Sequence, residues 1–152
     1  MLSPEYPQMN DFEYVDKIFC ELAEKEEDIG LDALSHNEKV IITVWHATGL
    51  ISSGGLTYFF VWKDANPNVA DYFEEIGMAN AATIIRQFFS LFSINKYDDF
   101  SSADRDDYIE ENIEKVKDKV DFLNREILAQ LPIVEEKTAT YIRENLRNIT
   151  FN

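Results

Sequence analysis

The spacing of apolar residues predicts helices along almost the whole chain. The first stripe recurs at intervals of three and four residues and consists of Phe12, Val15, Phe19 and Leu22. This spacing places the apolar side chains on one face of an amphipathic helix. Asn10 can cap the start of this helix, and Gly30 is a natural end for it.

A capping box predicts a second helix, because the Ser35 hydroxyl can accept the amide of Glu38 while that glutamate reaches back. Its apolar stripe runs to the sequence Ser52-Ser53-Gly54-Gly55, where the two glycines are expected to break the helix. The next segment, 56–62, is rich in β-branched and aromatic residues, which would suit a strand. No other segment of comparable quality could pair with it, so we expect a short buried helix instead.

Capping residues mark two further helices. Asn66 followed by Pro67 predicts a helix that ends at Gly77. Asn80 is expected to cap the following helix, whose apolar positions over 81–92 cover much of its circumference. We therefore expect this to be the central and most buried helix.

The longest periodic stretch lies in the last third of the chain. Its apolar residues alternate at spacings of four and three, in a seam made of Ile109, Ile113, Val116, Val120, Leu123 and Ile127. Such a short seam favours packing within a bundle over an extended coiled coil. After Pro132 a last helix is expected. The sequence thus predicts an all-α fold, a single-domain bundle of about seven helices with a buried central helix. Residues 1–9 would form an N-terminal lead and residues 10–152 the domain.

The charge of the chain restricts its partners. Its 152 residues include 29 Asp and Glu against 14 Lys and Arg, a formal net charge of −15. This charge disfavours direct binding to nucleic acid or to an anionic membrane, so we expect a basic or DNA-binding protein as partner. The longest apolar run, 56–62, is too short to span a bilayer. A single cysteine forms no internal disulfide, and a cytoplasmic location is expected.

Acidic residues concentrate in two segments, at the end of the first predicted helix and at the head of the long periodic stretch. Together these segments give the candidate partner-binding residues Glu24, Glu26, Glu27, Asp28, Asp104, Asp106, Asp107, Glu110, Glu111 and Glu114. Carboxylates in the first turn of a helix interact favourably with its dipole, which accounts for the aspartates of 104–107. The acids near the end of the first helix gain nothing of that kind. A surface that maintains solubility and a surface that binds a partner both fit this pattern.

The chain offers no constellation of catalytic or metal-binding residues. Neither His36 nor His46 belongs to a metal-ligand or nucleophile motif, and His46 is expected to be a structural histidine. The aspartates of 98–106 lack the glycine and the closing glutamate of an EF-hand loop. Cys20, among bulky apolar neighbours, is expected to be a buried thiol. We therefore expect no enzyme activity, no cofactor and no metal.

The central block of the chain carries a family motif. It comprises Val44-Trp45, the run Ser53-Gly54-Gly55-Leu56-Thr57-Tyr58-Phe59-Phe60, and Ile76-Gly77-Met78. This block resembles the bacterial DNA-mimic proteins, which are mostly catalogued as a domain of unknown function. The scaffold residues of the motif are Trp45, Ser53, Gly54, Gly55, Phe59, Phe60 and Gly77. Relatives usually show Asn-Gly-Gly-Phe followed by a glutamine, whereas this chain has Ser53, Leu56 and Tyr58 at those positions.

The resemblance implies a small, acidic, all-helical protein whose carboxylates imitate the phosphates of duplex DNA. Such a protein occupies the DNA-binding surface of a transcription factor or of another nucleic-acid-binding protein. Duplex DNA carries one charge per about 1.7 Å of axis, so fifteen net charges correspond to about 26 Å of duplex.

Two other functions remain open at this point. An immunity protein against a basic nuclease toxin would need the same electrostatics. A small-molecule binder or enzyme would have its pocket at the Gly54-Gly55 turn, near Trp45, His46, Ser53, Tyr58 and Trp62. The short apolar seam also allows a homodimer.

Overall fold

The computed structural model describes residues 9–94 and 96–151. Seven α-helices are found in these residues: α1 (Asp11–Ile29), α2 (His36–Val61), α3 (Val69–Glu75), α4 (Ala79–Ser90), α5 (Ser102–Asn112), α6 (Lys117–Gln130) and α7 (Val134–Glu144). Short 3-10 turns accompany them: η2 (Leu31–Ala33), η3 (Tyr97–Asp99), η4 (Ile113–Lys115), η5 (Leu131–Ile133) and η6 (Leu146–Asn148). Strands are absent from this part of the chain, so the all-α prediction is confirmed. The expected N-terminal lead falls almost wholly in residues 1–8, outside the described residues.

Capping hydrogen bonds confirm the predicted starts of α1 and α2. The Asn10 side chain accepts the amide of Glu13 at 2.9 Å, and Gly30 ends α1 with a φ of 85°. At α2 the Ser35 hydroxyl accepts the Glu38 amide at 3.2 Å, while the Glu38 carboxylate accepts the Ser35 amide at 2.8 Å. The local sequence therefore determines where these two helices begin.

The central helix is α2, and not α4 as the sequence suggested. α2 packs against α1, α3, α5, α6 and α7, whereas α4 packs mainly against α3 and α6. The rings of Phe88 and Phe89 on α4 reach Phe60 of α2, with centroids 6.2 Å apart in both pairs. By length and composition α2 could also cross a membrane. In this fold, half of the residues in its most apolar stretch are buried. Its apolar character thus matches its central place in the bundle.

The paired glycines bend α2 without ending it. Gly55 has a φ of 78° and a ψ of −170°, a conformation that is essentially restricted to glycine. The Leu56 amide that the bend frees donates to Asn124 Oδ1 of α6 at 2.8 Å. Residues 56–61 are helical beyond the bend, and their Phe59 and Phe60 are fully buried. The prediction of a short buried helix in place of a strand is therefore confirmed.

Two helices begin elsewhere than the sequence suggested. α3 begins at Val69, because Asn66 Oδ1 accepts the Asn68 amide at 2.8 Å and closes a turn ahead of the helix. α4 begins at Ala79, so Asn80 lies inside the helix and does not cap it.

The long periodic stretch forms two helices, α5 and α6, in place of one. η4 and Val116, with a φ of −127° and a ψ of 12°, divide them. The bend directs α5 toward α2, where the Tyr108 ring stacks on Phe60 at 6.1 Å, while α6 packs along α4. The buried residues of the seam are Ile109, Val120, Leu123 and Ile127. The seam that suggested a homodimer is therefore used by the chain's own core.

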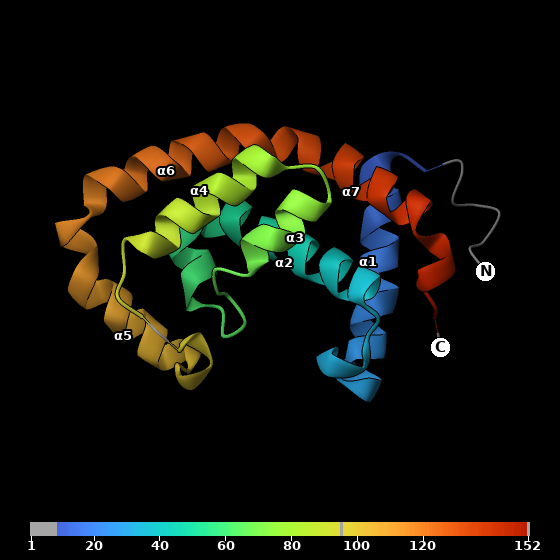
Figure 1. Cartoon of the computed structure of the whole chain (residues 1–152), viewed down its shortest axis with the longest axis horizontal. Coiled ribbons are helices and arrows are strands. Elements are labelled where there is room, and N and C mark those ends of the chain that lie inside the picture. Colours follow the sequence, from blue (N-terminus) through green and yellow to red (C-terminus); the bar gives the residue numbers. More distant parts are fainter. Residues whose placement is uncertain (1–8, 95, 152) are drawn as a thin grey trace.

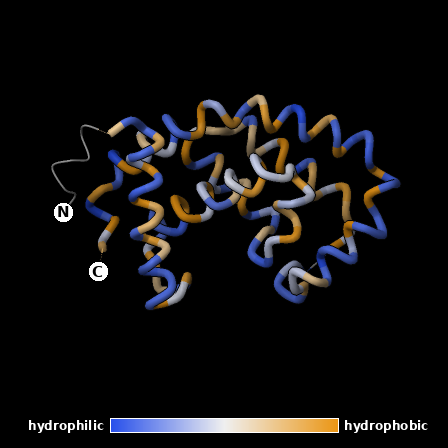
Figure 2. Tube along the Cα trace, turned by 180° about the vertical axis from the view of Figure 1, so that it is seen from behind, coloured by the Kyte–Doolittle hydropathy of each residue, from blue (hydrophilic) through white to orange (hydrophobic). Residues whose placement is uncertain are grey.

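The helices form an arch (Figure 1). α6 and α7 lie along one long edge, α5 descends at one end, and α1 descends at the other. The loop that follows α2 lies between these two ends (Figure 1). Hydrophobic and hydrophilic positions alternate along the outer helices, as amphipathic packing requires (Figure 2).

Candidate partner-binding surface

The first candidate group lies at the C-terminal end of α1. Glu24, Glu27 and Asp28 are exposed, and Glu26 is half-buried. Lys25, in the middle of this run, points inward and is only 8% exposed. The helix therefore presents its acids to solvent and keeps the base between them inside.

Lys25 forms a buried ion pair with Glu38 of α2, with 2.8 Å between Nζ and Oε2. Nζ also donates to the backbone oxygen and the hydroxyl of Thr150, at 2.9 and 2.8 Å, and Glu38 Oε2 accepts the Thr150 amide at 3.0 Å. Burial alone raises the pKa of Glu38, but hydrogen bonds from Lys25, Ser35 and Thr150 outweigh it and hold that pKa below its usual value. The pair thus ties the end of the chain to α1 and α2.

The second candidate group lies on α5 and η4. Its members are all exposed: Asp104, Asp106, Asp107, Glu110, Glu111 and Glu114. Asp104 forms a capping box with Ser101, a structural role that needs no partner. The ion pairs found within the described residues use acids outside these two groups.

Arg105 belongs to the same helical turn as these acids, yet it is fully buried. Its guanidinium group donates to the backbone oxygens of Phe60, Trp62, Lys63, Ala65, Tyr97 and Phe100. It also lies over the Phe60 and Tyr97 rings, 6.0 and 5.5 Å from their centroids. Burial lowers the pKa of Arg105, and Tyr97, Asp64 and Asp98 act in the opposite direction. This one side chain connects the loop after α2 to the segment 97–100, a role that the sequence did not reveal.

The two acidic groups do not form one continuous stripe. The C-terminal end of α1 and α5 lie on opposite sides of the open, concave side of the arch, with the loop after α2 between them (Figure 1). The α1 acids Glu24, Glu26 and Glu27 instead line a groove. They share it with three acids that the sequence did not mark as partner-binding: Asp32, Asp64 and Asp98.

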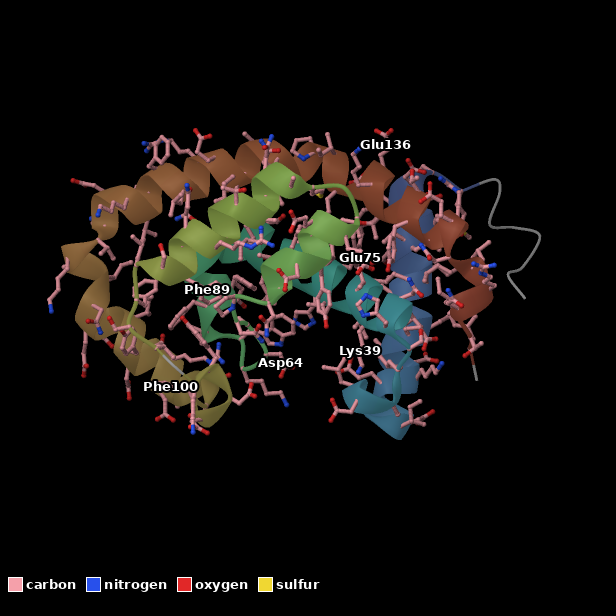
Figure 3. The ribbon with its side chains drawn as sticks, in the orientation of Figure 1. Lys39, Asp64, Glu75, Phe89, Phe100 and Glu136 are labelled. Atoms are coloured by element: carbon pink, nitrogen blue, oxygen red, sulfur yellow. The ribbon has the colours of Figure 1, made fainter. Side chains whose placement is uncertain are left out.

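This groove, between α1 and the loop after α2, has a volume of about 810 Å³. Its floor is aromatic. The His46 ring stacks on Trp62, with 4.6 Å between centroids and 7° between planes. The Phe19 ring packs edge-on against His46, with 6.4 Å between centroids. His46 is exposed, so it is a surface residue of the groove and not the structural histidine that was expected. Lys39 and Asp64 mark the two sides of the opening (Figure 3).

The groove is not at the Gly54-Gly55 turn. A Cβ atom on Gly55 would lie 3.0 Å from Asn124 Oδ1, so the Asn124 side chain already occupies the inner side of that turn. Of the residues expected around a pocket there, His46 and Trp62 line the groove, whereas Ser53 and Tyr58 do not.

Cys20 is exposed, contrary to the prediction of a buried thiol. Partial desolvation raises the pKa of this thiol, and the carboxylates of Asp16, Glu24 and Glu21 raise it further. The side chain is therefore accessible on α1 but weakly ionised at neutral pH.

Comparison with known proteins assigns the chain to a family. A family model described as DMP19-like protein matches residues 32–145, about three-quarters of the chain. The chain belongs to the DMP19-like protein family. No curated protein and no solved structure matches it significantly. The recognition of the DNA-mimic family from the sequence motif is confirmed.

The DMP19-like match divides the candidate residues. It begins at residue 32, so the α5 group and the groove residues Asp32, Asp64 and Asp98 lie inside the matched segment. The acids of 24–28 lie outside it. One wall of the groove is thus contributed by a helix that the family model does not cover.

The motif residues of the DMP19-like segment serve mainly as scaffold. Phe59 and Phe60 are fully buried, and Trp45 Nε1 donates to Asp16 Oδ1 of α1 at 3.2 Å. Gly77 follows α3 with a φ of 90°, which favours glycine. Ser53 is exposed. The motif therefore positions α2 and the loop after it, and with them the floor of the groove.

Proposed function

We propose that the protein is an acidic protein-binding module that occupies the nucleic-acid-binding surface of a basic protein and competes there with DNA. One observation carries the proposal: nine exposed acids of the two candidate groups face solvent while Lys25 and Arg105, the bases within those segments, are buried. A basic surface that binds phosphates would meet a dense array of carboxylates here. Membership of the DMP19-like family and the resemblance to DNA-mimic proteins support this proposal.

Electrostatic attraction of this kind depends strongly on salt. Exposed charges attract one another over about 8–10 Å at physiological ionic strength and over less at higher salt. Charge complementarity acts mainly on the association rate and on the choice of partner. We therefore expect the complex to form rapidly at low salt and to dissociate as salt rises.

The test uses basic proteins that bind heparin, isolated from the source organism and passed over the immobilised protein at low salt. The expected result is the retention of one or a few proteins that are released both by salt and by added duplex DNA. Retained proteins that duplex DNA does not release would refute the proposal.

Two variants with the same change in charge control for nonspecific attraction. The first neutralises acids of both candidate groups: Glu24→Gln, Glu27→Gln, Asp106→Asn and Asp107→Asn. The second neutralises four exposed acids elsewhere: Asp121→Asn, Glu126→Gln, Glu135→Gln and Glu136→Gln. We expect the first variant to lose the partner and the second to keep it. Equal losses in both would mean that only net charge matters.

A further inference from the structure

The groove between α1 and the loop after α2 is large and is lined by several separate segments of the chain. Its walls come from α1, η2, the loop 62–68 and η3, segments that are distant in sequence. Its volume of about 810 Å³ lies within the range of ligand-binding clefts, about 300–1,000 Å³. The opening faces the concave side of the arch, between Lys39 and Asp64 (Figure 3).

The rim of the groove has an excess of negative charge. Six carboxylates line it, those of Glu24, Glu26, Glu27, Asp32, Asp64 and Asp98, against the two ammonium groups of Lys39 and Lys63. None of these eight side chains forms an ion pair with another part of the described chain. The rim is therefore complementary to a ligand that carries several positive charges.

The floor of the groove adds aromatic surface to this charge. His46 and Trp62 present a stacked pair of rings, and Phe19 and Tyr72 also line the groove. Trp62 is half-buried, so part of its indole ring is accessible. Cations bind favourably over aromatic faces, and tryptophan is the strongest of these platforms. Arginine uses both features because its guanidinium group is planar and weakly hydrated, stacks on rings and pairs with carboxylates.

We propose that this groove receives an arginine-bearing segment of the basic partner. Arginine side chains lie on the aromatic floor, and their guanidinium groups face the rim carboxylates. The inference rests on the proposed function and deepens it, since it names the surface and the chemistry that hold the partner. It makes the groove, and not the α5 group, the place where the partner is recognised.

Titration calorimetry with a nona-arginine peptide tests the inference, with a nona-lysine peptide of equal charge for comparison. We expect the arginine peptide to bind about fivefold more tightly at about 150 mM salt. The groove variant is Glu27→Gln with Asp64→Asn, and its matched control is Asp106→Asn with Asp107→Asn on α5. The groove variant should weaken binding roughly five- to tenfold, and the control by less than about twofold. Circular dichroism verifies that both variants are folded.

A second readout locates the peptide in the groove. In a Trp45→Phe background Trp62 is the remaining tryptophan. Its emission is expected to change as the arginine peptide saturates the protein. Unchanged emission at saturation, or equal weakening by the groove and α5 variants, would overturn the inference. Displacement of the peptide by spermidine at an equal concentration of charge would also overturn it, because the occupant would then be a small polycation.

The outcomes separate this inference from the proposed function. A partner that DNA displaces, but that binds the groove variant as tightly as the unmodified protein, leaves the proposed function standing and refutes the groove. Binding of the arginine peptide in the groove, with no retained protein that DNA displaces, supports the groove and refutes the proposed function.

Discussion

Replacement of Arg105 by lysine is expected to destabilise the protein strongly although it conserves the charge. The five N–H groups of the Arg105 guanidinium donate to six backbone oxygens, so two of these oxygens share one N–H, at distances such as 2.9 Å to Lys63 and 2.9 Å to Tyr97. A lysine ammonium has three donors and no planar fork, so at least three of these oxygens lose their partner.

The magnitude follows from those lost bonds. Hydrogen bonds to charged groups contribute about 1.5–3 kcal/mol each. Three lost bonds would therefore cost about 4–9 kcal/mol, and relaxation of the loops toward water reduces this to about 3–5 kcal/mol. A domain of this size is stable by about 5–15 kcal/mol, so the variant should retain only part of its stability.

Urea unfolding measures this change, with circular dichroism for the helices and, in the Trp45→Phe background, tryptophan emission for Trp62. Arg125→Lys is the matched control, because Arg125 is exposed on α6 and makes no hydrogen bond or ion pair among the described residues. We expect Arg105→Lys to lower the midpoint markedly and Arg125→Lys to leave it unchanged. Equal midpoints for the two variants would show that the Arg105 guanidinium does not hold the loop after α2 and the segment 97–100 together, and would refute the prediction.

Three further predictions concern the bend in α2, the buried ion pair and the thiol. Gly55→Ala should destabilise the protein by about 1–3 kcal/mol, because the φ of 78° at Gly55 and its contact with Asn124 both oppose a side chain. Gly49→Ala should instead stabilise the protein by about 0.5–1 kcal/mol, because Gly49 lies within α2 and has open space around it. Thermal unfolding of the two variants distinguishes these signs. The lowered pKa of Glu38 contributes stability that is complete above its unfolded value of about 4.3 and is lost as pH falls through the folded value. Urea unfolding from pH 7 to pH 3 should therefore show a steeper loss in the unmodified protein than in Glu38→Gln, which starts about 3–5 kcal/mol lower because Lys25 is left buried and unpaired. Alkylation of Cys20 by iodoacetamide should be slower than that of a free thiol and faster in added salt, which screens the carboxylates that raise its pKa; a rate insensitive to salt would contradict this.

Local signals in the sequence predicted several helix boundaries correctly. Asn10, Ser35 and Gly30 act through hydrogen bonds and dihedral angles within a few residues of themselves, so their roles could be predicted without tertiary structure. The break between α5 and α6 could not, because the apolar seam continues through it in the same register and only packing against α2 shows the bend. Asn80 is a good capping residue by type, but α4 begins just ahead of it at Ala79.

The candidate site depends on contacts that the sequence does not encode locally. Lys25 is flanked by acids in the sequence, a pattern typical of an exposed base. Its partners are nevertheless Glu38 and Thr150, and Thr150 is 125 residues away. The groove likewise combines acids of α1 with Asp64 and Asp98 from two distant loops. Composition revealed the excess of acids, but only the fold shows which of them share one cavity.

The separation of the two acidic groups limits how a partner can bind. A single basic surface that holds both groups has to extend along the long axis of the arch, from α1 to α5 (Figure 1). A partner recognised in the groove alone leaves the α5 acids to solubility and to long-range attraction. The two-residue variants distinguish these arrangements, because losses of binding at independent distant sites add in free energy. Additive losses from Glu27→Gln with Asp64→Asn and from Asp106→Asn with Asp107→Asn would mean that the partner spans the arch. A loss confined to the first pair would mean that the groove is sufficient.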